Sequence, residues 1–88
     1  MRIWCKEWHK GKVLRDCVIE DYENDTRTHK IIRGLEKACH ELDLAVPIWL
    51  DSNVGEFKRS SKTRFRADSF IEEIPFDYLE LQIIEEDY

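Results

Sequence analysis

The chain has 88 residues, of which 42% are hydrophobic and 38% are charged, and its formal net charge is −5. This length allows one domain but not two, so residues 1–88 are predicted to form a single domain. With only three Gly and two Pro, the composition excludes a disordered chain. No apolar run is long enough to span a membrane, so no membrane partner is expected. The negative net charge disfavours nucleic acid as a partner.

The start of the sequence and its cysteines indicate a compartment. The run Met1-Arg2-Ile3-Trp4-Cys5-Lys6 is charged within two residues and lacks the apolar region of a secretory signal. The chain has three cysteines, whereas a small secreted domain would more often carry an even, paired set. We therefore expect a cytoplasmic protein.

Residues 2–20 are predicted to form a β-hairpin, because two runs of β-forming residues flank the turn signal Lys10-Gly11-Lys12. One register joins opposite charges at three places. These pairs are Arg2–Glu20, Lys6–Asp16 and Glu7–Arg15. The same register sets Trp4 opposite Val18 and Trp8 opposite Leu14 on one face, and it sets Ile3–Ile19 and Cys5–Cys17 on the other. Both faces of the hairpin thus carry apolar pairs.

Residues 26–44 are predicted to form the main helix, capped by Asp25 or Thr26 and ended before Pro47. Its apolar residues recur at helical spacing and should form one buried stripe. They are Ile31, Ile32, Leu35, Ala38, Cys39 and Leu42.

The second half of the chain is predicted to hold shorter elements. We expect a strand at 47–50, a short helix near 54–59, a basic loop at 60–67 and a last strand at 78–85. Residues 70–74 are interpreted as a short helix, with a strand paired to 78–84 as the alternative. The expected fold is α+β, a mostly antiparallel sheet of about four strands with one main helix and short extra helices, in the order ββαβ(αα)β.

Five runs of the sequence resemble a family of small uncharacterised bacterial proteins. They are Ile3-Trp4-Cys5-Lys6, Asp25-Thr26-Arg27-Thr28-His29-Lys30, Pro47-Ile48-Trp49-Leu50-Asp51, Glu56-Phe57-Lys58-Arg59 and Phe70-Ile71-Glu72-Glu73-Ile74. The resemblance covers essentially the whole chain. It implies a free-standing bacterial cytosolic protein, and it implies no known activity.

Basic residues gather in two clusters, at 27–37 and 58–66, while the chain from Ala67 onward has eight acids and no base. The basic residues are candidate contacts for a phosphate or a nucleic acid, with Phe65 available to stack on a base. The candidates are Arg27, Lys30, Lys58, Arg59, Lys62, Arg64 and Arg66. The alternative is that these charges pair with the acidic C-terminal third.

The three cysteines are predicted to pack in the core rather than to act chemically. A Cys₃His zinc site would need Cys5, Cys17, Cys39 and His40 to converge, yet no C-x₂-C spacing exists. No sequence feature brings a histidine to a thiol, and no motif specifies a reaction. We therefore predict no metal, no cofactor and no enzymatic activity.

The remaining hypothesis is a non-catalytic protein-interaction module of the bacterial cytosol, binding another protein or a second copy of itself. Trp4 and Trp8 are the candidate interface residues, because a contiguous apolar patch on one hairpin face is typical of an interface. In the competing interpretation Phe57, Phe65 and Phe70 cover that face within one chain. The alternative function is nucleic-acid or phosphate binding by the clusters at 27–37 and 58–66.

Overall fold

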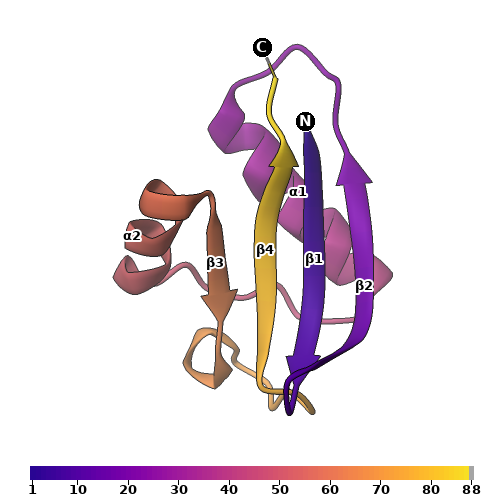
Figure 1. The fold of residues 1–88 in the computed structure, drawn as a ribbon, viewed down its shortest axis with the longest axis vertical. Helices are drawn as coiled ribbons and strands as arrows, with labels where there is room; N and C mark the ends of the chain where they lie inside the picture. The colour runs from indigo at the N-terminus through magenta and orange to yellow at the C-terminus, as the bar shows by residue number, and fades with distance from the viewer. Residues whose placement is uncertain (88) are drawn as a thin grey trace.

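The computed structural model describes residues 1–87 and confirms the predicted α+β fold (Figure 1). One four-stranded sheet has the order β2-β1-β4-β3, and every neighbouring pair of strands is antiparallel. The elements are β1 (Arg2–His9), β2 (Lys12–Glu20), α1 (Arg27–Glu41), α2 (Asp51–Ser60), β3 (Lys62–Phe65), the 3₁₀ turn η1 (Ala67–Ser69) and β4 (Tyr78–Glu85).

The predicted hairpin register is confirmed from Arg2–Glu20 to Glu7–Arg15. A bulge then shifts the pairing, so Trp8 lies opposite Val13 rather than opposite Leu14 as predicted. The shift occurs next to the turn, where Lys10 and Gly11 both have positive φ, at 50° and 76°. Positive φ at both central residues is typical of the two-residue hairpin turn whose twist matches the twist of the paired strands.

The main helix is confirmed as α1, which is shorter than predicted. Thr26 caps it by accepting a hydrogen bond from the His29 N–H at 3.2 Å. The predicted stripe is buried except for Ile32, which is 44% exposed. Ile32 was expected in the core, but at this turn of the helix its side chain faces a groove beside α2 instead of the sheet.

The segment between α1 and β4 departs most from the prediction. Residues 47–50 form no strand, and the third strand is Lys62–Phe65, inside the expected basic loop. Its Thr63 and Phe65 are buried while the alternate residues are exposed. The short helix predicted near 54–59 exists as the longer α2. Residues 70–74 form neither helix nor strand, because Phe70 is buried and the next residue, Ile71, is 89% exposed, so the run presents no single apolar side.

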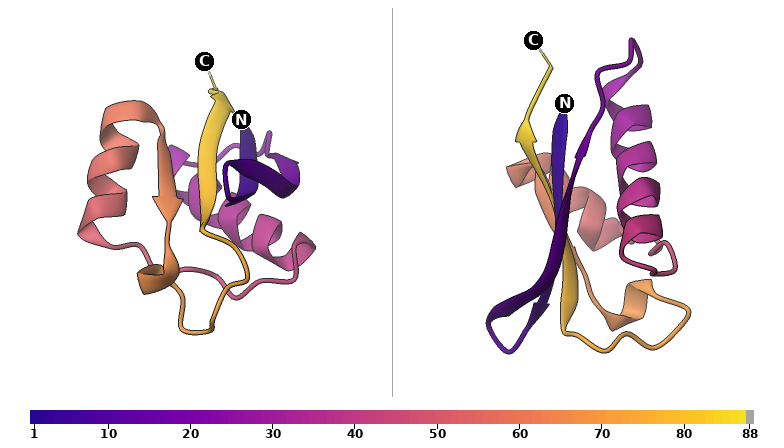
Figure 2. Two further views of the ribbon diagram at one scale, coloured as in Figure 1. Left: turned by 60° about the horizontal axis from the view of Figure 1, so that its bottom comes forward. Right: turned by 90° about the vertical axis from the view of Figure 1, so that its right-hand side faces the viewer.

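One core lies between the sheet and the two helices (Figure 2). It joins Ile3, Cys5, Leu79 and Leu81 of the sheet to the α1 stripe. Phe57, Phe65 and Phe70 belong to this same core, so the interpretation that they cover the second face of the sheet is wrong. Among residues 1–87, no helix combines the length and the apolar character needed to cross a bilayer.

Candidate functional site

The candidate site is the face of the sheet opposite the core, called here the open face, which no helix of residues 1–87 covers (Figure 2). Residues that oppose each other across paired strands share a face, so the register defines its members. They are Arg2, Trp4, Lys6 and Trp8 of β1; Val13, Asp16, Val18 and Glu20 of β2; Tyr78, Glu80 and Gln82 of β4; and Lys62 and Arg64 of β3.

Lys6 lies at the centre of the open face between the two tryptophans. Its Nζ is 3.8 Å from the Trp4 ring centroid and 5.9 Å from the Trp8 ring centroid. Its ammonium also lies 2.9 Å from Glu80 Oε1 and donates to Gln82 Oε1 at 3.2 Å. Cation–π contacts and ion pairing together stabilise a charge removed from water. Lys6 is therefore only 7% exposed although no helix lies above it.

Glu80 is held in its ionised form by its neighbours. Burial acts to raise the pKa of this carboxyl, but the hydrogen bond and charge of Lys6 and the Arg64 guanidinium at 3.4 Å outweigh burial and lower the pKa. The nearby Trp8 indole N–H also lowers the pKa of Glu80. This buried Nε1 nevertheless forms no hydrogen bond within residues 1–87. The centre of the open face is thus a fixed ion pair.

The two margins of the open face carry opposite charge. The β2 margin consists of Asp16, Val18 and Glu20, and Asp16 accepts a hydrogen bond from Trp4 Nε1 at 2.8 Å. The β3 margin consists of Lys62, Arg64 and Arg66. The guanidinium groups of Arg64 and Arg66 lie over the Tyr78 ring, at 4.9 and 5.9 Å from its centroid. A central row of paired residues crosses the four strands from one margin to the other. It runs Asp16–Lys6–Glu80–Arg64, and its charges alternate in sign.

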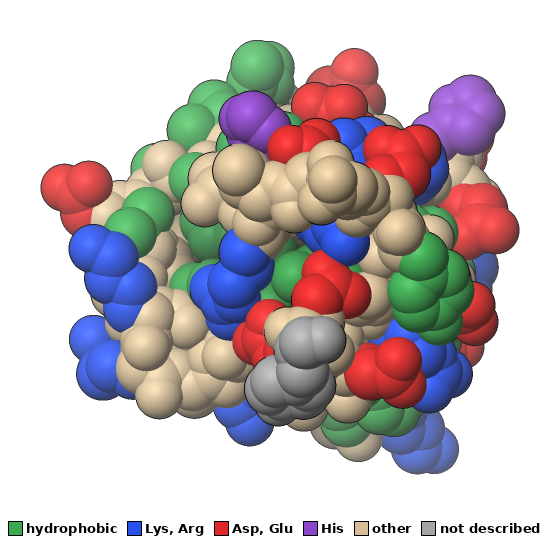
Figure 3. Space-filling model, turned by 90° about the horizontal axis from the view of Figure 1, so that it is seen from above, with side chains coloured by type: hydrophobic (Ala, Val, Ile, Leu, Met, Phe, Trp, Pro, Cys, Tyr) green, Lys and Arg blue, Asp and Glu red, His purple; other side chains and the backbone are tan. Residues whose placement is uncertain are grey.

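The predicted basic cluster at 27–37 is largely neutralised. The Arg27 guanidinium binds both carboxylate oxygens of Glu86, at 3.0 and 2.9 Å. Lys30 is buried and its Nζ lies 2.6 Å from Asp87. Arg33 forms ion pairs with Asp21, Glu23 and Asp25. Viewed from the end of the molecule where both termini lie, acidic and basic side chains adjoin each other (Figure 3).

The cluster at 58–66 is more open. Lys58, Arg59, Lys62 and Arg66 are exposed, and none forms an ion pair within residues 1–87. In the described part of the chain, Arg64 alone of this cluster is paired, to Glu80. The two clusters approach each other where Arg27 and Lys58 line one groove. Phe65, expected to stack on a nucleobase, is 0% exposed and is a core residue.

The cysteines occupy the predicted positions in the fold. Cys5 and Cys17 are cross-strand partners, Cys39 lies on α1, and all three are free thiols. Burial raises the pKa of Cys5, raises that of Cys17 to about 12 and raises that of Cys39 to about 11. These values oppose thiolate formation, on which nucleophilic and metal-binding cysteines depend. In the described part of the chain, no three His, Cys, Asp or Glu side chains are grouped to hold a metal ion.

The sequence named Trp4 and Trp8 as candidate interface residues, and it did not name the residues that surround them on the open face. Lys6 carried a usable signal, because in a strand it shares a face with the residues two positions before and after it. Glu80 and Tyr78 carried no such signal, since no local pattern shows that β4 lies next to β1 in the sheet. No protein-family model, no curated protein and no solved structure gives a significant match to the chain. The resemblance to a bacterial family stays a prediction.

Proposed function

We propose that the chain is a cytosolic protein-interaction module whose partner is a second copy of itself, bound through the open face. The observation that carries the proposal is the alternating charge of the central row, Asp16–Lys6–Glu80–Arg64, between an acidic and a basic margin. Such a row is complementary to its own reverse. Two-fold symmetry is the usual arrangement of homodimers, and it brings the same surface of both copies together.

The direction of the two-fold axis follows from the margins. If two sheets stack with the axis between them and parallel to the strands, the β2 margin of one copy faces the β3 margin of the other. Asp16 then faces Arg64 of the second copy, and Lys6 faces its Glu80. An axis across the strands would set each margin against itself, with acid facing acid. Charge complementarity therefore favours the first arrangement, which is also the near-aligned packing of a β-sandwich.

Apolar area on the open face supports the same partner. Trp4 and Trp8 are partly exposed, and their β2 neighbours Val18 and Val13 are 40% and 41% exposed. Stacking two open faces would remove this area from water, at a gain of about 25 cal/mol per Å² of apolar surface. A chain this short has a limited core, for which association is a common supplement.

Nucleic-acid binding is the second candidate, and the unpaired bases at 58–66 favour it. Against it, the Lys6 ammonium already occupies one face of the Trp4 ring, and the central charges are paired. A nucleobase stacking there would have to displace those contacts. The net charge of −5 adds repulsion at long range.

A charge-swap experiment tests the proposal. One double variant makes the β2 margin basic (Asp16→Lys with Glu20→Lys), and the other makes the β3 margin acidic (Lys62→Glu with Arg66→Glu); all four side chains are exposed. By light scattering at micromolar concentration, the unmodified chain should have the mass of a dimer and each variant that of a monomer. Mixing the two variants should restore a dimer, because each margin then faces its opposite charge.

Other results would contradict self-association. A monomeric mass for the unmodified chain, or a mixture of variants that stays monomeric, would refute it. Binding of single-stranded RNA or DNA by the unmodified chain, weakening steeply with salt and lost in the acidic β3 variant, would favour the nucleic-acid candidate instead. The basic β2 variant keeps Lys62 and Arg66, so under that candidate it should still bind nucleic acid although its charge swap opposes dimerisation, and the two functions are therefore distinguishable.

A further inference from the structure

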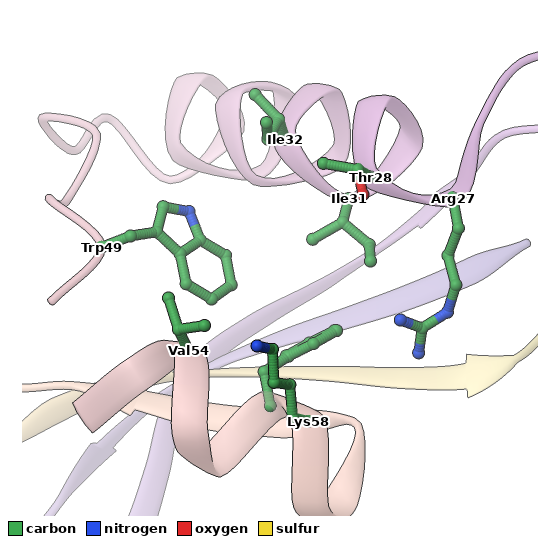
Figure 4. A pocket seen from close by; sticks show the side chains of 8 residues that line it. Arg27, Thr28, Ile31, Ile32, Trp49, Val54 and Lys58 are labelled. Atoms are coloured by element: carbon green, nitrogen blue, oxygen red, sulfur yellow. The ribbon is translucent and has the colours of Figure 1, made fainter. Parts of the chain in front are cut away.

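A groove of about 450 Å³ lies between α1 and α2, on the helix-covered side of the sheet (Figure 4). Ile31, Phe57 and Trp49 form its apolar interior, with Trp49 packed edge-on against Phe57 at 5.7 Å between centroids. Ile32 and Val54 form its outer walls and are 44% and 40% exposed. Two isolated apolar side chains would need no explanation, but these two face a shared apolar groove.

The polar groups of the groove are cationic or neutral. Arg27, Thr28 and Lys58 line it, and no acidic side chain of the described residues 1–87 does. The Arg27 guanidinium lies 5.4 Å from the Phe57 ring centroid and binds the Glu86 carboxylate with two hydrogen bonds. Those hydrogen bonds lower the pKa of Glu86, so a carboxylate is stabilised as an anion at this rim. The second cation, Lys58, forms no ion pair within residues 1–87.

The size of the groove selects the class of ligand. A volume of about 450 Å³ falls within the range of small-molecule sites. A stable protein partner would instead need to cover a surface of roughly 800 Å² on each side, far more than the walls of this groove provide. An apolar interior with one cation at its mouth that is unpaired within residues 1–87 suits a molecule that has an apolar body and a single negative end.

We propose that this groove binds a small amphiphilic carboxylate, in which an alkyl chain or ring carries one carboxylate group. The apolar part lies against Trp49, Val54 and Ile32, and the carboxylate binds the Lys58 ammonium. The site is independent of self-association, because the open face is on the other side of the sheet. Binding and dimerisation are therefore separable by experiment.

Titration of the full chain with decanoate, below its micelle-forming concentration, tests the site by ¹H–¹⁵N NMR. The indole N–H signal of Trp49, assigned from a Trp49→Phe spectrum, should shift and saturate. The signals of Trp4 and Trp8 are internal controls on the open face and should not move. Lys58→Glu should weaken binding by about tenfold or more, since it replaces an attractive charge by a repulsive one.

Two matched variants separate charge from shape. Arg59→Glu makes the same charge change one residue away, on a side chain that lies over Gly55 and does not line the groove, and should leave the affinity within about twofold. Val54→Phe should block the groove without changing charge. The proposal is overturned if decanoate does not saturate the Trp49 signal, if decanol binds as tightly as decanoate, or if Arg59→Glu weakens binding as much as Lys58→Glu.

Discussion

The two faces of the sheet are completed in different ways. On the helix-covered face, Ile3, Cys5, Leu79 and Leu81 are all 0% exposed within the core. On the open face, burial is reached without a second layer, because tryptophan rings and long charged side chains lie across one another around Lys6. The first face gains stability from apolar packing and the second from paired charges and cation–π contacts.

This difference shows how a four-stranded sheet can remain stable with one helix layer. Buried charge is tolerated on the open face because each group has a partner: Glu80 contacts both Lys6 and Arg64. The same side chains keep the face polar enough to stand in water and ordered enough to present one fixed pattern of charge. We therefore expect changes to the two faces to differ in size and in their response to pH.

The largest loss should follow a cavity on the helix-covered face. Leu81→Ala removes a side chain that is 0% exposed, between Cys5 on one strand and Thr63 on the other. Urea unfolding should show a loss of about 3 kcal/mol. The matched control is Ile84→Ala three residues along, where the side chain is 39% exposed, and its loss should be below about 1 kcal/mol. Equal losses at the two positions would mean that the faces are assigned wrongly.

A smaller, pH-dependent loss should follow a change on the open face. The folded pKa of Glu80 lies below its usual 4.5, so its ionised form stabilises the fold above that pH, and this contribution is lost as pH falls through the folded pKa. Glu80→Gln should cost about 2 kcal/mol near pH 7, since Lys6 then loses its charged partner. Urea unfolding from pH 7 to pH 3 should show the gap to the unmodified chain closing.

The control for that experiment is Glu73→Gln. Glu73 is exposed and forms no ion pair within residues 1–87, so its substitution should leave the unfolding free energy unchanged at every pH. A gap for Glu80→Gln that stays constant with pH would show that the ion pair with Lys6 contributes nothing.

Local patterns were enough to predict the hairpin and the main helix. Charge pairs such as Arg2–Glu20 specify the hairpin register because both partners lie within one short hairpin. The bulge at Trp8 was missed because it depends on the turn conformation at Lys10 and Gly11. Ile32 was misplaced because spacing gives a helical face but not what packs against that face at each turn.

Features that depend on contacts between distant segments were not predictable. Lys62–Phe65 looked like a basic loop, since only two of its four residues are buried and its strand state comes from pairing with β4. The open face was predicted only in part, because the hairpin pattern alone placed Trp4 and Trp8 on one face. Glu80, which pairs with Lys6 across 74 positions of sequence, required the strand order.

The last and smallest effect tests how closely α1 approaches the helix-covered face. A Cβ atom added at Gly34 would lie 2.5 Å from Ile3 Cδ1, inside contact distance. Ala is favoured over Gly in a helix by about 1 kcal/mol, but overpacking a core costs about 1–3 kcal/mol. Gly34→Ala should therefore lower the free energy of unfolding in urea by about 1 kcal/mol.

Two further variants are controls for this close approach. Ile3→Val removes Cδ1, and the nearest remaining atom lies at 3.7 Å, so in that background Gly34→Ala should stabilise the fold. Gly55→Ala in α2, which meets only the flexible end of Arg59 at 3.2 Å, should stabilise it in either background. If Gly34→Ala stabilises the unmodified chain as much as Gly55→Ala does, then α1 does not pack against β1 this closely, and the helix-covered face is less tightly packed than the structure shows.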